Sequence, residues 1–122
     1  MSEYLNAVLK RRSMYSLSRE ATLPDAELEE KLAAIVKNMP TSYNMQSSHL
    51  VLLLGEANQK LWRGIVMETL KKQIPPEKFP RTEKKINGFA ESYGTVLFFN
   101  DEDVADGVRK SFPLYAENVE PL

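Results

Sequence analysis

Two nearly continuous apolar segments most constrain what this chain can fold into. They are HLVLLLG at residues 49–55 and GTVLFFN at residues 94–100. A short apolar run bounded by glycine is typical of a β-strand buried on both faces. A sheet of only two such strands cannot cover itself and is marginal in water. We therefore expect either a fragment of a larger domain or a protomer whose sheet another chain completes.

Helical periodicity and capping residues predict helices around these strands. Ser2 is a suitable N-cap for a first helix that runs to about Arg12. Pro24 and Asp25 open a second helix, which Pro40 ends. Further helices are expected at residues 57–72 and 83–91, and from residue 101 onward. The last residues, ENVEPL, carry no cap or polar tail, which also suggests an incomplete domain.

Composition excludes several classes of function. The chain has 122 residues, 43% hydrophobic and 27% charged, as in one soluble globular domain. A net charge of -1 argues against a general nucleic-acid binder, and the absence of cysteine together with a single histidine, His49, argues against a metal site. No apolar run approaches the ~20 residues of a membrane span, and no signal peptide is evident, so we expect a cytoplasmic protein with no membrane partner.

The sequence offers no catalytic side chain. The only histidine begins a strand, so no Ser-His-acid arrangement can be argued. The carboxylates fall at helix starts, where capping explains them. No glycine-rich phosphate-binding loop of the G-x-G-x-x-G or Walker type is present.

Two polar clusters remain as candidate binding sites. The first is Arg11-Arg12-Ser13, where guanidinium forks beside a hydroxyl suit a phosphate group. The second is the loop at residues 40–47, whose amide side chains suit the edge of a heteroaromatic ring. Together they match the two ends of flavin mononucleotide (FMN). From the residues alone the alternative stays open that the arginines complement a helix dipole and that the loop only caps its neighbours.

Three motifs resemble the flavin-dependent nitroreductase family, in its subgroup of short fungal and bacterial members. RRSMYSLS resembles the family's N-terminal Arg-Arg-Ser signature. PTSYNMQSSHLVLLLG is similar to its Pro-Ser-Ser-x-Asn-x-Gln loop and following strand, and FAESYGTVLFFND to the segment of a later central strand. The resemblance runs in order over essentially the whole chain.

This resemblance implies an α+β fold with a central mixed sheet flanked by helices. Residues 1–122 would be a single nitroreductase-like domain that is incomplete at its C-terminus. The FMN phosphate and ribityl end would be held by Arg11, Arg12 and Ser13. The isoalloxazine ring would be approached by Ser42, Asn44 and Gln46, from the partner subunit, because family members bind flavin at a homodimer interface.

The implied activity is NAD(P)H-dependent reduction of nitroaromatic or quinone-like acceptors through FMN, in a homodimer. Two departures from the family bear on this. Tyr15 stands where many relatives have a second basic residue near the ring. Relatives also continue into strands and helices that supply a glycine-containing ring-binding segment and further basic phosphate ligands. The alternative is a non-catalytic fragment or assembly subunit that does not retain flavin.

Overall fold

A computed structural model of the chain describes residues 2–113 and divides the chain into two compact units. Unit 1 comprises Met1–Glu20 and Glu56–Tyr93, and unit 2 comprises Ala21–Gly55 and Gly94–Leu122. The terminal ENVEPL segment lies outside the described residues. None of the helices among the described residues is long and apolar enough to cross a membrane.

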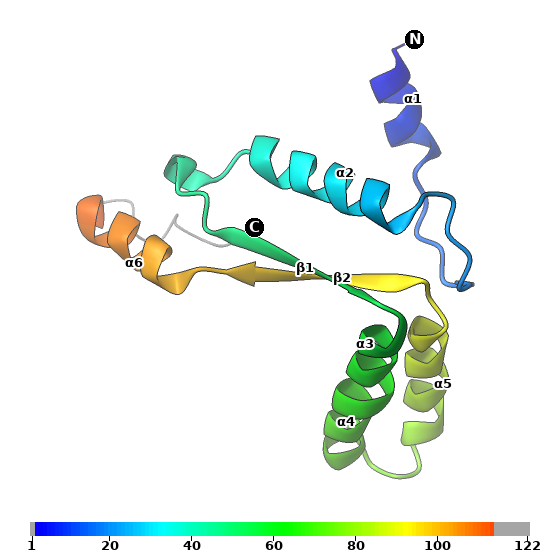
Figure 1. Ribbon diagram of the computed structural model, residues 1–122. Coiled ribbons are helices and arrows are strands. Elements are labelled where there is room, and N and C mark those ends of the chain that lie inside the picture. The colour runs from blue at the N-terminus through cyan, green and yellow to red at the C-terminus, as the bar shows by residue number, and fades with distance from the viewer. Residues whose placement is uncertain (1, 114–122) are drawn as a thin grey trace. The chain divides into compact units, whose positions relative to one another are not determined.

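Unit 2 is built on the two predicted strands. β1 (Ser48–Leu54) pairs antiparallel with β2 (Gly94–Asn100), in a register that sets Ser48 opposite Asn100 and Leu54 opposite Gly94. Figure 1 shows them as a two-stranded ribbon. The expected α+β class is confirmed, while the expected mixed sheet is represented among the described residues by this antiparallel pair alone.

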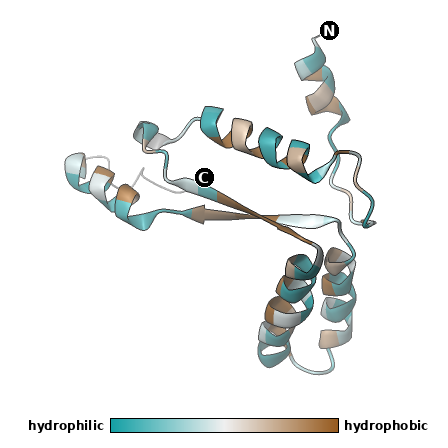
Figure 2. Ribbon diagram, viewed as in Figure 1, coloured by the Kyte–Doolittle hydropathy of each residue, from teal (hydrophilic) through white to brown (hydrophobic). Residues whose placement is uncertain are grey.

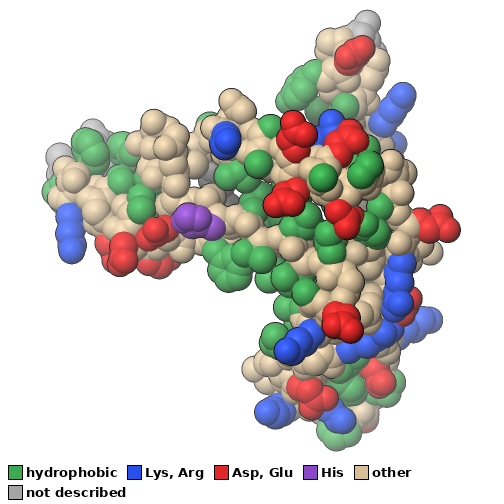
Figure 3. All heavy atoms as spheres, viewed as in Figure 1, with side chains coloured by type: hydrophobic (Ala, Val, Ile, Leu, Met, Phe, Trp, Pro, Cys, Tyr) green, Lys and Arg blue, Asp and Glu red, His purple; other side chains and the backbone are tan. Residues whose placement is uncertain are grey.

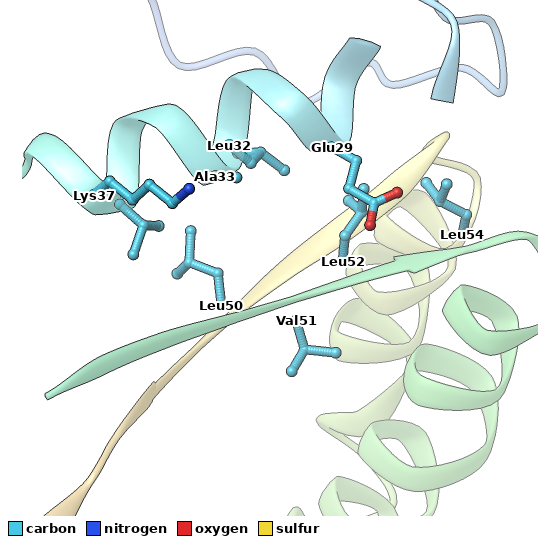
Figure 4. A pocket seen from close by; sticks show the side chains of 9 residues that line it. Glu29, Leu32, Ala33, Lys37, Leu50, Val51, Leu52 and Leu54 are labelled. Carbon is cyan, nitrogen blue, oxygen red and sulfur yellow. The ribbon is translucent and has the colours of Figure 1, made fainter. Parts of the chain in front are cut away.

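One helix of unit 2 runs along one face of the ribbon (Figure 1). This helix, α2 (Asp25–Asn38), has Pro24 as its N-cap and Met39 as its C-cap, and it stops before Pro40 as predicted, because Pro40 has no N–H to continue it. The side chains of β1 alternate between faces. Leu50 and Leu52 therefore point toward α2 while Val51 points away (Figure 4).

The expectation that both strands are buried on both faces is wrong for the described chain. No residue of β1 or β2 is fully buried. Val51 keeps 41% of its surface exposed and Phe99 53%, and the alternation places both on the face away from α2. Apolar sequence shows that a strand can be covered, but the cover itself must come from other segments.

The remaining elements of unit 2 are a capped helix and a short turn. α6 (Glu102–Ser111) starts after Asp101, whose Oδ1 accepts the backbone N–H groups of Asp103 at 3.1 Å and Val104 at 3.3 Å. The predicted acidic cap is therefore confirmed. A short 3₁₀ turn, η1 (Ser42–Asn44), lies between α2 and β1.

Unit 1 begins with α1 (Glu3–Lys10), whose first turn is capped by Ser2 Oγ accepting from the N–H of Leu5 at 3.2 Å. The helix ends two residues earlier than predicted. Arg11 is already its C-cap, with an extended ψ of 135°, so Arg12 lies beyond the last turn.

A helical run and a second helix pack together in the rest of unit 1 (Figure 1). The run consists of α3 (Gly55–Gln59), the π-helical segment η2 (Lys60–Val66) and α4 (Met67–Gln73), near the predicted bounds. α5 (Phe79–Ala90) begins earlier than the expected Glu83, because Pro80 is tolerated in a first helical turn. The rings of Trp62 and Phe89 pack at 5.0 Å between η2 and α5.

The buried apolar core is small. Among the described residues only Ile86, Ala90 and Ala105 are buried hydrophobic residues. Hydrophobic colour in Figure 2 follows the strands, and green side chains reach the surface in Figure 3. Exposed fractions of 64% at Phe98 and 59% at Ile35 are large for apolar side chains. The described residues thus leave apolar surface that further protein could cover.

Replacing Gly94 with alanine is expected to destabilise the ribbon. A Cβ at Gly94 would lie 2.5 Å from Leu54 Cδ2 and 2.7 Å from the carbonyl oxygen of Leu53, and the backbone oxygen cannot move aside cheaply. Such overpacking costs about 1 to 3 kcal/mol. Gly107→Ala is the matched control, because a Cβ there meets nothing within 4 Å and helix propensity favours alanine by about 0.5 to 1 kcal/mol. Thermal melts followed by circular dichroism measure both variants. Equal melting temperatures for Gly94→Ala and Gly107→Ala would contradict the prediction.

Candidate functional site

The arginine cluster lies at the exposed end of α1. Arg11 Nη1 donates to Ser13 Oγ at 3.4 Å, so the structure brings these two predicted residues together. Arg12 Nη1 donates instead to the carbonyl oxygens of Leu9 at 2.8 Å and Arg11 at 2.7 Å. The helix-end role that the sequence left open therefore has direct contacts at Arg12. The side chains of Arg11 and Ser13 make no such contact with the end of the helix.

The charges of Arg11 and Arg12 are not balanced locally. Within residues 2–113 neither guanidinium forms an ion pair, whereas Arg19, Arg63 and Arg109 each pair with a carboxylate. Adjacent positive charges with a hydroxyl beside them form a donor set that fits a phosphate dianion. The chemistry of this cluster is thus compatible with the predicted FMN phosphate.

In the second cluster, the loop is capped by a residue that was not predicted to be important. Thr41 Oγ1 accepts from the N–H of Gln46 at 3.1 Å, and the carbonyl oxygen of Thr41 accepts from the N–H of Asn44 at 3.0 Å. Among the described residues, the side-chain amides of Asn44 and Gln46 have no hydrogen-bond partner, and both residues are exposed. Ser42 lies in η1, but its side chain lies outside the described residues. The side-chain amides of Asn44 and Gln46 therefore do not serve as caps of the loop.

The backbone of this loop is strained. Tyr43, Asn44 and Gln46 have φ angles of 54°, 51° and 51°, in the left-handed region. For residues other than glycine this conformation costs roughly 1 to 2 kcal/mol each, less for asparagine. Such strain tends to persist at functional sites, where the surrounding structure enforces it.

Two buried oxygens without partners lie beside the same loop. Ser47 is 1% exposed, and its Oγ has no hydrogen-bond partner among the described residues. The same holds for Oδ1 of Asn100, the residue opposite Ser48 in the ribbon. Buried oxygens of this kind are normally satisfied by protein, water or a ligand atom. This end of the ribbon can therefore take up additional donors.

Two hollows of unit 2 are lined by residues of α2 and β1. A cavity of about 600 Å³ lies between α2 and β1 (Figure 4). It is lined by Glu29, Leu32, Ala33, Val36, Lys37, Leu50, Val51, Leu52 and Leu54. A smaller one, of about 220 Å³, is lined partly by Thr41, Gln46 and Ser48. Because ligand pockets usually hold ~300 to 1,000 Å³, the smaller hollow alone cannot enclose a flavin ring.

The two predicted clusters fall in different units. Arg11, Arg12 and Ser13 belong to unit 1, whereas residues 42–46 belong to unit 2. That the two clusters bind one ligand together remains a prediction. His49, interpreted as a strand residue, lies in β1 with Nε2 3.9 Å from Asp101 Oδ2 (purple in Figure 3).

Sequence reasoning missed a charged cluster in unit 1. Glu91 Oε1 accepts from Arg63 Nη2 at 2.5 Å and from Arg19 Nη2 at 3.1 Å. The hydrogen bond from Arg63, together with both positive charges, lowers the pKa of the Glu91 carboxyl below its ordinary 4.5. The contribution of these contacts to stability is therefore present above about pH 4.5 and is lost as the pH falls through the lowered pKa. A separation of 72 residues between Arg19 and Glu91 leaves no sequence pattern to find.

The fold and the motif residues define the class of protein. The model of the nitroreductase family matches residues 8–119, and the chain belongs to this family. In sequence it is 30% identical over 119 residues to nitroreductase FRM2 of Saccharomyces cerevisiae, covering 93% of this chain and 56% of that protein. It is 29% identical over 118 residues to the putative nitroreductase HBN1 of the same yeast, at 95% and 58% coverage. The chain thus spans a little over half the length of these relatives.

Solved structures agree with this assignment. Nitroreductase CinD from Lactococcus lactis in complex with nicotinic acid matches with a TM-score of 0.83 and 32% identity, over 96% of this chain and 58% of that one. A nitroreductase from S. cerevisiae matches with a TM-score of 0.74 and 26% identity, over 95% and 62%. The predicted family is confirmed.

Proposed function

We propose that this chain forms part of an FMN-dependent, NAD(P)H-using oxidoreductase of the cytoplasm that works as a homodimer. Its acceptors would be nitroaromatic or quinone-like molecules. Support comes from the family and from CinD, of which one solved structure holds 4-nitrophenol. Residues 1–122 would belong to one nitroreductase-like domain, and they cover a little over half the length of the relatives.

The observation that carries the proposal is that the donors of both clusters are left available by the fold. Thr41 caps the loop, so the amides of Asn44 and Gln46 remain exposed and unbonded within the described residues. Arg11 likewise has Ser13 as its side-chain partner and no carboxylate within residues 2–113. A fold that needed these groups for its own stability would bury or pair them.

In this proposal each cluster holds one end of the cofactor. Arg11, Arg12 and Ser13 bind the phosphate and ribityl end through charge-assisted hydrogen bonds. Ser42, Asn44 and Gln46 of the partner protomer bind the ring edge. FMN, when bound, supplies the redox chemistry, and the protein contributes position, electrostatics and exclusion of water. We therefore assign no catalytic side chain.

Titration of the purified chain with FMN tests the proposal. Binding is expected to quench flavin fluorescence with saturation at one FMN per chain, and the complex should oxidise NADH or NADPH when 4-nitrophenol or a quinone is added. A chain that takes up no FMN at tens of micromolar would contradict the proposal for residues 1–122. It would favour the alternative of a non-catalytic fragment or assembly subunit.

A further inference from the structure

We propose that Glu91 is a positioning residue that anchors the segment at residues 11–20 to the helices of unit 1 through Arg19. By restraining the segment that carries Arg11, Arg12 and Ser13, it would raise the affinity for FMN. The second statement rests on the proposed function, whereas the anchor itself does not.

The segment has little else to hold it. Residues 11–20 form no helix or strand, and every one of them is exposed. The hydrogen bonds within it are local, such as Leu17 N–H to the carbonyl of Tyr15 at 3.1 Å. Among the described residues, the contact between Arg19 and Glu91 is the one hydrogen bond or ion pair that joins this segment to α3–α5. Its removal would leave the segment tethered by the chain alone.

Glu91 is well prepared to receive Arg19. It is the C-cap of α5, with its N–H bonded to the carbonyl of Asn87 at 3.1 Å. Its carboxylate already accepts from Arg63 of η2, and Arg63 Nη1 is itself held by Gln59 Oε1 at 2.5 Å. Contacts with α5 and η2 therefore orient the carboxylate of Glu91 independently of Arg19. Binding of Arg19 then costs little additional entropy at Glu91.

The anchor at Arg19 limits how far the arginine cluster can move, because few residues separate the two. Arg19 lies six residues after Ser13, and six extended residues span at most ~21 Å. With Arg19 held at Glu91, the cluster can move no farther than this from one fixed point of unit 1. Part of the entropy that FMN binding would otherwise cost is already lost in the free protein.

Substitution of Arg19 provides the test. Arg19→Gln is expected to lower the NMR order parameters of the backbone amides at residues 11–20 and to raise the FMN dissociation constant about two- to fivefold, the range typical of an exposed ion pair. Glu91→Gln should have at least the same effect, because it also weakens the contact with Arg63. Arg19→Lys keeps the charge and should restore most of both properties.

A matched control removes a different exposed ion pair. Lys31→Gln breaks the contact of Lys31 with Glu27 in α2, at 3.7 Å, where side-chain exposure is similar. It should change neither the order parameters at residues 11–20 nor FMN affinity. Circular dichroism spectra would confirm that all variants fold.

The two readouts separate the anchor from the proposed function. Unchanged order parameters in Arg19→Gln would overturn the anchor, whatever happens to FMN. Lower order parameters with an unchanged dissociation constant would overturn the positioning role. If the unaltered chain binds no FMN, the proposed function and the positioning role fall together, and the order parameters alone then decide whether Glu91 is an anchor.

Discussion

Replacement of both Arg11 and Arg12 with alanine is expected to weaken FMN binding by about 3 kcal/mol or more, a factor of at least ~10². Each hydrogen bond between a charged donor and a phosphate contributes roughly 1.5 to 3 kcal/mol. Neither guanidinium has a carboxylate partner within residues 2–113, so no compensating contact is freed by the change. Fluorescence titration with FMN, at fixed ionic strength, measures the loss.

Single substitutions distinguish phosphate binding from the helix-end role. Arg12→Ala also removes the bonds to the carbonyl oxygens at the end of α1, so it should lower thermal stability as well as affinity. Arg11→Ala loses only the 3.4 Å contact with Ser13 and should lower affinity alone. Arg81→Ala is the control, since Arg81 is an exposed arginine that forms no ion pair within the described residues. Full affinity in Arg11→Ala would remove Arg11 from the proposed phosphate site.

The parts of the fold that were predicted correctly depend on local chemistry. Pro24 and Pro40 bound α2 because proline sets φ and lacks a donor, and Asp101 begins α6 because its carboxylate accepts two backbone N–H groups. The predicted start of α5 was wrong because the helix was expected only from Glu83, although Pro80 fits a first helical turn. The exposure of Val51 and Phe99 was missed because burial depends on which segments cover a strand.

In the candidate site, too, local chemistry could be predicted from the sequence and tertiary structure could not. Residue chemistry identified the two clusters, and the family resemblance gave them roles. The sequence could not show that Thr41 rather than Asn44 or Gln46 caps the loop, because a cap is decided by backbone geometry. It could not show the positive φ of Gln46 either, since that residue rarely adopts it. The contact of Arg19 with Glu91 depends on tertiary structure alone.

Loss of the amide at Asn44 or Gln46 is expected to slow reduction of FMN by NAD(P)H by about 10² and to shift the flavin reduction potential. Donors aimed at the ring edge stabilise the negative charge that develops on reduction, and one such donor is typically worth a few kcal/mol. Glycine is the replacement of choice. With φ angles of 51° at both positions, a leucine would add backbone strain, whereas glycine accepts this conformation without cost.

Asn44→Gly and Gln46→Gly should therefore keep the melting temperature within a few degrees while reduction slows, because relief of strain offsets the greater freedom of the unfolded chain. Thr41→Val serves as the opposite control. It removes the hydroxyl that accepts from the N–H of Gln46, so it should lower the melting temperature while the ring-edge amides stay in place. Anaerobic stopped-flow reduction and thermal melts on the same samples compare the three variants. Normal reduction with a lowered melting temperature in the glycine variants would make the loop a structural element, and the cofactor site would then consist of the arginine cluster alone.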